Sequence, residues 1–377
     1  MKRTQVMKIV LFSAIAALVL LTGLPASGAE RARVVLKKLS PTDVNGNGVF
    51  LLGTGDNYAI NCQKGDQCMS MGGPVGTGWY CGGFFNFALN GREAGTSEVG
   101  RMFESEQGRR AILDSVWHME AADVRVRFLG LPGRDFLFCE MTVDPQQEIK
   151  SLSLTTLCYP AYFTSYYGQR EEARYLQTPS ELIRQAEGRT NIRLVPKDNW
   201  WLLYGDDYFD VAKTKESEGP CAMMVLPEDV ASITVGGLGY GVVTTVSISP
   251  QTRKIRMAFW KMKGRTNAEA IAYFRKNGEA VRKELATLDF MPENVRTFDL
   301  PGTTAELERF ARSETAGAGF QKKAADILAW IKAESAGLTA KGDGVNATER
   351  KLELLKKCAG FVYEARLAEM LTSLEKN

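Results

Sequence analysis

Polar and apolar residues alternate strictly over Asp123–Phe128, the pattern of a β-strand with one face in solvent. After turn residues at 131–134, the alternation returns over Leu137–Val143. It returns again over Ile149–Thr156, beyond a break at Asp144-Pro145. Three consecutive strands with short connections predict an antiparallel meander, whose apolar face must pack against a second layer.

Further strands are predicted at Arg33–Leu39, Val230–Ser249 and Lys254–Lys261. Thr266-Asn267-Ala268-Glu269 is a capping box, and it opens a predicted helix over about 266–288. The apolar stripe of this helix should lie across the sheet. Residues 30–300 are therefore expected to form a mainly β domain, a large antiparallel β-sandwich with a packed helix.

A different periodicity follows Leu300-Pro301-Gly302, where strand alternation gives way to helical spacing. Helices are predicted at about Gly319–Ala336 and Thr348–Leu374, with a Gly-rich break at 341–344. Residues 301–377 are expected to form a C-terminal α-helical hairpin. We expect this hairpin to be separable from the β domain.

The N-terminal residues 1–29 have the pattern of a signal peptide. Lys2, Arg3 and Lys8 precede the apolar run Ile9–Leu24, and small residues follow as far as Ala29. We expect an exported protein, periplasmic or extracellular, and an uncleaved N-terminal anchor is the alternative. No later stretch is long and apolar enough to predict a membrane span.

The charge balance argues against a nucleic-acid partner. The chain has 47 Lys and Arg, and removing the three in the leader leaves 44, equal to the 44 Asp and Glu. A nucleic-acid-binding protein normally has a basic excess or a basic stripe. The expected partners are a polysaccharide or other glycan, or a protein that binds the C-terminal helices.

All seven cysteines follow the leader, so at least one thiol stays unpaired unless chains cross-link. Cys62 and Cys68 flank a turn-rich loop, and we predict a disulfide between them. Cys139 lies in a strand pattern and is expected to be a small buried hydrophobic residue. The pattern assigns no partner to Cys158 or Cys221.

Asp43, Asn45 and Asn47 match the opening of a calcium-binding loop, with Gly48 at the sixth position. The twelfth position, which should carry a carboxylate, is Thr54. Asn-Gly is also a strong hairpin-turn signal. We therefore expect no cofactor, and calcium is the alternative.

His118 is the single histidine of the chain, which excludes metal sites that need several histidines from one chain. It could act as a lone general base or be a structural residue. His118, Glu120 and Tyr166 are the catalytic candidates that the sequence offers.

The stretch 199–210 combines five aromatic residues with three aspartates. Trp200, Trp201, Asp206 and Asp207 are the predicted ligand-binding residues, because aromatic rings pack on sugar C–H surfaces and carboxylates accept hydroxyl hydrogens. Adjacent residues on a strand face opposite ways, so at most one tryptophan should fill a one-sided core.

The strand pattern over Arg31–Leu300, the late helix and the aromatic and acidic loops resemble the galactose-mutarotase-like β-supersandwich proteins of carbohydrate metabolism. The resemblance implies binding or processing of carbohydrate. It carries no family motif, so no catalytic residue is transferred. Lyases with such folds use His, Tyr, Asn and Arg, of which His118 supplies the histidine.

Three functions are compatible with these features. The favoured one is an exported, non-catalytic carbohydrate-binding protein. The second is a polysaccharide-degrading enzyme, a lyase or hydrolase that uses a carboxylate pair or His–Tyr chemistry. The third is a structural or assembly protein that acts through its C-terminal helices.

Overall fold

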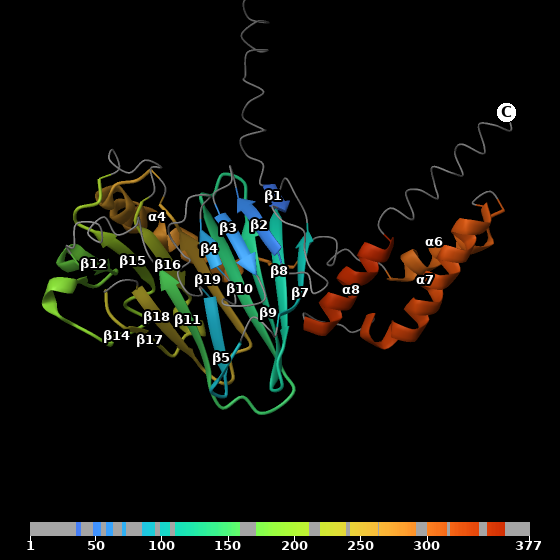
Figure 1. The fold of residues 1–377 in the computed structure, drawn as a ribbon, viewed down its shortest axis with the longest axis horizontal. Coiled ribbons are helices and arrows are strands. Elements are labelled where there is room, and N and C mark those ends of the chain that lie inside the picture. Colours follow the sequence, from blue (N-terminus) through green and yellow to red (C-terminus); the bar gives the residue numbers. More distant parts are fainter. Residues whose placement is uncertain are drawn as a thin grey trace, which may run out of the picture.

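A computed structural model describes the backbone of most of the chain from β1 onward (Figure 1). The described residues are 35–38, 48–53, 58–62, 70–72, 85–94, 99–105, 110–158, 171–210, 219–238, 242–262, 264–291, 300–314, 317–338 and 345–358. The predicted signal peptide, residues 1–29, lies outside them.

Two antiparallel sheets form a sandwich, as predicted (Figure 1). The nine-stranded sheet has the order β13 (Leu182–Arg184), β12 (Arg174–Gln177), β15 (Trp201–Asp206), β16 (Cys221–Val225), β19 (Lys254–Trp260), β10 (Phe136–Pro145), β9 (Ala122–Gly130), β8 (Ala111–His118) and β7 (Val99–Ser105). The six-stranded sheet has the order β14 (Ile192–Leu194), β17 (Ser232–Val235), β18 (Val242–Ile248), β11 (Leu152–Cys158), β5 (Phe85–Leu89) and β6 (Arg92–Glu93). A separate four-stranded sheet consists of β1 (Val35–Lys38), β2 (Gly48–Gly53), β3 (Tyr58–Cys62) and β4 (Ser70–Gly72).

The main core lies between the two large sheets. The inward residues of β9, such as Val124 and Phe128, are fully buried against inward residues of the six-stranded sheet, such as Leu154 and Val246. Cys139 belongs to this core, which confirms its predicted burial, and burial raises the pKa of its thiol. The period-two alternation of the sequence therefore does mark the face that packs against the second layer.

The predicted meander is wrong in its third strand. β9 pairs with β10, but β11 pairs with β18 and β5 in the opposite sheet. The second edge of β10 is occupied by β19, with Phe136 opposite Trp260 and Thr142 opposite Lys254. Alternation indicates that a strand has one apolar and one polar face, but it does not indicate which sheet the strand joins.

One half of the outer face of the nine-stranded sheet, the face turned away from the six-stranded sheet, is apolar. Helix α4 (Asn267–Thr287) lies on it, in agreement with the predicted span of 266–288. The Thr266–Glu269 capping box is present. Phe274 of α4 stacks on Trp201 with ring centroids 4.9 Å apart and meets Trp260 edge to face. A second apolar core thus lies beneath α4.

The other half of the outer face is charged. Arg125, Arg127 and Glu140 lie here, and they are 1%, 2% and 4% exposed. The Glu140 carboxylate lies 3.7 Å from Arg127, 3.6 Å from Arg256 and 3.8 Å from Lys254. The alternation predicted a solvent-facing row at these positions, and that is wrong for Arg125 and Arg127. Cross-strand ion pairing and the covering helix α8 account for the burial.

The C-terminal residues form helices α6 (Leu300–Arg312), α7 (Gly317–Leu338) and α8 (Val345–Cys358). α6 and α7 pack together around Leu307, Phe310 and Ile327. The sequence predicted two helices after a break at Leu300-Pro301-Gly302, whereas α6 begins there, because proline is tolerated in the first turn of a helix.

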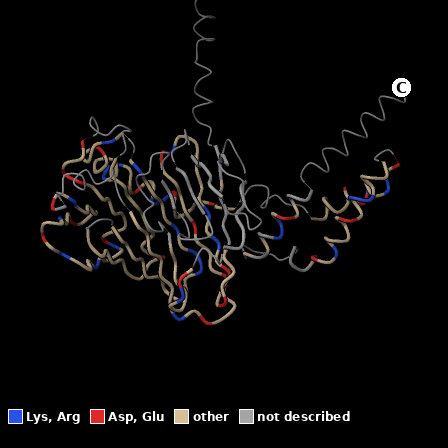
Figure 2. The backbone as a smooth tube through the Cα atoms, viewed as in Figure 1, with Lys and Arg blue, Asp and Glu red and all other residues tan. Residues whose placement is uncertain are grey.

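Helix α8 packs against β9 and β10, and Arg125 Nη2 donates to the Val345 carbonyl at 2.8 Å. The helices extend from the β8–β9 side of the sandwich (Figure 1). None of the helices in the described part of the chain is long and apolar enough to cross a membrane. Cationic and anionic residues are interspersed over strands and helices (Figure 2).

Replacing Glu140 with glutamine should lower the free energy of unfolding by about 3–5 kcal/mol, because it leaves the buried Arg127 and the partly buried Arg256 and Lys254 without their shared carboxylate. Chemical denaturation measures this loss. Glu279→Gln is the control, since Glu279 pairs with Arg282 on the exposed side of α4 and such pairs contribute about 0.5 kcal/mol. Equal losses in the two variants would contradict a structural role for the buried charges.

Candidate functional site

Polar and aromatic side chains gather at the β13–β12–β15 edge of the nine-stranded sheet. Arg184, Tyr175 and Gly205 lie opposite one another on these three strands. The Tyr175 ring covers Gly205 so closely that a Cβ atom at position 205 would be 2.4 Å from the phenol oxygen. Glycine at this position is therefore what lets the tyrosine lie across the strand.

The Tyr175 hydroxyl is buried and has no hydrogen-bond partner among the described residues. Burial, and then the nearby Asp207 carboxylate, raise the pKa of Tyr175 far above its ordinary value. The phenol therefore stays protonated over the physiological range, and it presents a neutral donor beneath the neighbouring charged pair.

That charged pair is Arg184 and Asp207, in which Arg184 Nη1 donates to Asp207 Oδ2. Both side chains are accessible, at 41% and 45% exposure. Tyr208 follows directly and is 48% exposed. Its backbone N–H donates to Asp206 Oδ1 at 2.8 Å, which fixes the turn. We refer to Tyr175, Arg184, Asp207 and Tyr208 as the edge cluster.

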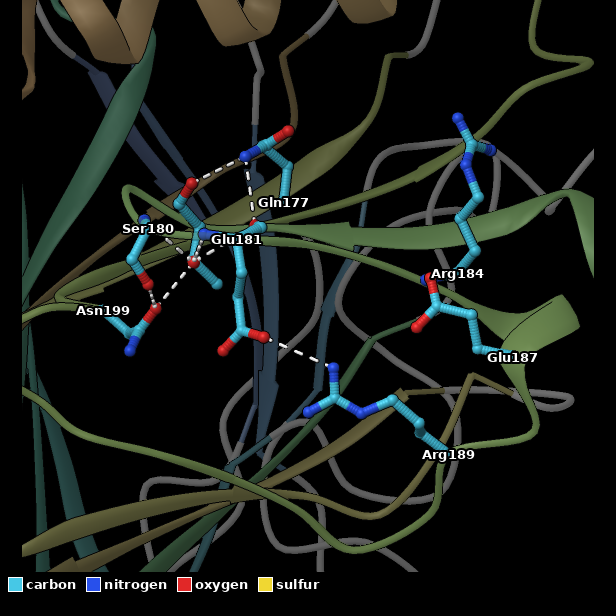
Figure 3. Close-up of polar contacts among 8 residues, drawn as sticks. Gln177, Ser180, Glu181, Arg184, Glu187, Arg189 and Asn199 are labelled. Atoms are coloured by element: carbon cyan, nitrogen blue, oxygen red, sulfur yellow. Dashed lines mark hydrogen bonds and ion pairs between the residues drawn. The ribbon is translucent and has the colours of Figure 1, made fainter.

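The turn between β12 and β13 is held by its own hydrogen bonds, shown in Figure 3. The Thr178 and Ser180 hydroxyls both donate to Asn199 Oδ1 at 2.6 Å. The Gln177 amide donates to the carbonyls of Thr178 and Glu181 at 2.7 and 3.1 Å. These bonds make the hairpin that carries Arg184 rigid. They also leave few polar groups of the turn available to a ligand.

Both predicted tryptophans pack against α4. Trp201 is 3% exposed and lies in the core under the helix. Trp200 is half-buried, and a Cβ atom at Gly278 would be 3.1 Å from its ring. The Arg282 guanidinium lies 5.2 Å from the centre of the Trp200 ring. The expectation that adjacent strand residues face opposite ways does not apply to the two tryptophans, because β15 begins at Trp201 and Trp200 precedes the strand.

The four predicted ligand-binding residues do not form one cluster. Trp201 and Asp206 are the first and last residues of β15, so they are roughly 16 Å apart along the strand. Asp206 is 1% exposed and buried, whereas Asp207 belongs to the edge cluster. The sequence analysis missed Tyr175 and Arg184, which come from other strands. The one sequence signal was Gly205, because a glycine inside a strand often marks a place where another group lies close to the backbone.

A second arrangement occurs at the β8–β9 turn. His118 Nδ1 lies 2.8 Å from Asp123 Oδ1, and Gln146 donates to Asp123 Oδ2 at 3.0 Å. The His118 side chain is 45% exposed, whereas that of Asp123 is 3% exposed. A buried, doubly hydrogen-bonded carboxylate thus orients an accessible imidazole. Glu120 is exposed and lies 3.6 Å from Arg92.

The other predicted site residues lie outside the described part of the chain: the calcium candidates Asp43, Asn45 and Asn47, the catalytic candidate Tyr166, and Cys68. Cys62 is the last residue of β3. Among the residues that are described, no group of three or more His, Cys, Asp or Glu could hold a metal ion.

A groove of about 560 Å³ follows one flank of α4 and is lined by Ala268, Ile271, Ala272, Arg275 and Lys276. It starts next to Asn267, whose amide donates to the Asp206 carbonyl at 2.7 Å.

No protein-family model matches the sequence, and no curated protein matches it significantly. Among solved structures, the chain is similar to the alpha-N-acetylgalactosaminidase NagBb from Bifidobacterium bifidum, at 10% identity and a TM-score of 0.41 over 68% of this chain and 40% of that one. It is also similar to an alpha-mannosidase from Enterococcus faecalis V583, at 8% identity and a TM-score of 0.39 over 60% and 30%.

A third similar structure is a putative aldose 1-epimerase from Klebsiella pneumoniae, at 9% identity and a TM-score of 0.37 over 65% of this chain and 87% of that one. The chain spans less than half the length of the two glycosidases. Two of these neighbours are glycosidases, and the third is a putative aldose 1-epimerase. Similarity at this level assigns no reaction or ligand to the chain.

Trp201→Ala should cost about 3–5 kcal/mol of stability, because it empties the space beneath Phe274. Trp200→Ala should cost less, about 1–2 kcal/mol, because this ring is half-buried at the rim of the same core. Thermal or urea unfolding of the two variants gives the comparison. A Trp201 variant that melts like the wild type would contradict a core role and return this residue to the ligand-binding candidates.

Proposed function

We propose that the protein is an exported, non-catalytic carbohydrate-binding protein whose binding surface is the edge cluster. The observation that carries the proposal is the exposed Arg184–Asp207 pair, followed in the sequence directly after Asp207 by the exposed Tyr208. An aromatic ring can pack on the C–H face of a sugar. The carboxylate can accept, and the guanidinium can donate, hydrogen bonds to its hydroxyls.

The setting of these groups favours binding over mere exposure. Asp206 fixes the backbone of Tyr208, and the β12–β13 turn is locked through Asn199. Binding groups held in place before the ligand arrives lose little conformational entropy on association. The predicted signal peptide accounts for export.

Tyr208→Ala and Asp207→Asn should each weaken binding to the recognised glycan by about tenfold or more, equivalent to at least about 1.4 kcal/mol. The glycan is identified by applying the purified mature protein to a glycan array, and affinity is then measured by calorimetry. Asp198→Asn is the matched control, because Asp198 is an exposed aspartate outside the edge cluster.

Unchanged melting temperatures in all three variants are needed to attribute the loss to binding. Two results would overturn the proposal: an array without any bound glycan, or a glycan that the Tyr208 and Asp207 variants retain with wild-type affinity.

A second candidate function is a polysaccharide lyase or hydrolase, and the His118–Asp123 pair favours it. Asp123 can hold the Nδ1–H tautomer, which leaves Nε2 as a proton acceptor. His118 is accessible, as a general base must be.

Catalysis at this pair predicts that His118→Ala lowers turnover by a factor of about 10²–10⁴, while glycan binding at the edge cluster is unaffected. Release of reducing ends and absorbance of unsaturated products measure the two chemistries. A wild-type protein that binds a polysaccharide without degrading it would exclude this candidate for that substrate.

The assembly function through the C-terminal helices gains no support from the surface. Among the side chains that are described, which leave out 336–338 of α7 and 346, 348, 349 and 355–358 of α8, the large apolar ones that are exposed are Leu182, Val195, Tyr208 and Val243. Helix α8 packs both against α7 and against β9 and β10 of the sandwich.

A further inference from the structure

Two cysteines face each other across the sandwich. Cys158 is the last residue of β11 in the six-stranded sheet, and Cys221 is the first residue of β16 in the nine-stranded sheet. Each is 1% exposed, and both belong to the core between the sheets. They are 63 positions apart in the sequence, so this meeting is a product of the fold.

A second contact shows how β11 and β16 are aligned. The Thr156 hydroxyl lies 3.7 Å from the Met223 sulfur. Inward-facing residues are two positions apart on each strand. Cys158 is the next inward-facing residue after Thr156 on β11, and Cys221 is the inward-facing residue before Met223 on β16. The same alignment therefore brings Cys158 and Cys221 together.

The immediate surroundings agree with this alignment. Both cysteines are free, buried thiols in the structure, and they lie close enough for Cys221 to affect the Cys158 thiol. Tyr204, which pairs with Cys221 across β15 and β16, lies close to both cysteines, and its hydroxyl is 2.7 Å from that of Thr244. Burial, and then Cys221, raise the pKa of the Cys158 thiol, so it is a poor nucleophile once the sandwich has closed.

We propose that Cys158 and Cys221 form a disulfide that joins the two sheets. The co-reactant is a small-molecule or protein disulfide, as is present where exported proteins fold. One cysteine thiolate attacks this disulfide and releases one thiolate from it. The second cysteine thiolate then attacks the mixed disulfide and releases the other. The cysteine pair gives up two protons and two electrons, and the reagent is reduced to two thiols.

The bond forms during folding, while both thiols still reach solvent. A disulfide requires its Cβ atoms to be about 3.5–4.5 Å apart, and thiols that are already in contact approach this geometry by side-chain rotation. The bond closes a loop that contains β12, β13, β14 and β15, and therefore the whole edge cluster. The disulfide joins β11 and β16, the strands at which that segment starts and ends. The proposal of this bond does not depend on what the edge cluster binds.

The test refolds the full mature chain from urea in a buffer of reduced and oxidised glutathione, followed by alkylation without reduction and peptide mapping. The expected result is a cross-linked pair of peptides that contain Cys158 and Cys221, with Cys139 alkylated as a free thiol. The oxidised protein should melt roughly 5–15 °C higher than the reduced protein.

Cys158→Ala and Cys221→Ala should each remove the part of this shift that the Cys158–Cys221 bond contributes, leaving at most what the predicted Cys62–Cys68 bond adds, and Cys139→Ala should retain the whole shift. Alkylated Cys158 and Cys221 in the refolded wild type would overturn the proposal, as would linkage of either residue to a different cysteine. The mapping uses the wild-type chain, so the result stands even if an alanine variant fails to fold.

Discussion

Every central strand of the nine-stranded sheet has two faces, and both must be covered. The six-stranded sheet covers the inner face with apolar side chains. The outer face needs two different covers, because one half is aromatic and the other half is charged. Helix α4 covers the aromatic half through Phe274, and helix α8 packs beside the charged half, where Glu140 balances several cations. A buried carboxylate is tolerated at such a position only when its partners are close.

Because the faces are occupied, the accessible chemistry lies at the edges and strand ends. The edge cluster uses the last strands of the sheet and the turn after β15. His118 uses the end of β8. In both places a buried carboxylate, Asp206 or Asp123, holds an exposed neighbour, so that rigid secondary structure positions a group that solvent can reach. This division separates the parts of the sequence that serve packing from those that are free for recognition.

Local patterns predicted the elements whose signal is itself local. Alternation located β9 and β10, and the capping box located α4 to within one residue. The sheet that β11 joins was not predictable, since strand alternation is the same in either sheet. The burial of Arg125 depends on Val345, which is 220 positions away. Arg184 and Tyr175 meet Asp207 through strand pairing, so a search along 199–210 could not find them. It selected Asp207, passed over the adjacent Tyr208, and grouped Asp207 with tryptophans at the other end of β15.

The pairing of β10 with β19 sets a constraint on how the chain reaches this state. Phe136 pairs with Trp260, which lies 124 positions later (260 − 136). Contacts between residues this far apart in the sequence require the chain to lose the conformational entropy of a long loop before the contacts stabilise it. Such contacts are associated with slow folding. Until β19 arrives, one edge of β10 is unpaired, and a strand of another chain could pair with it. The longer this edge stays unpaired during synthesis, the more the protein should depend on being kept apart from other copies of itself.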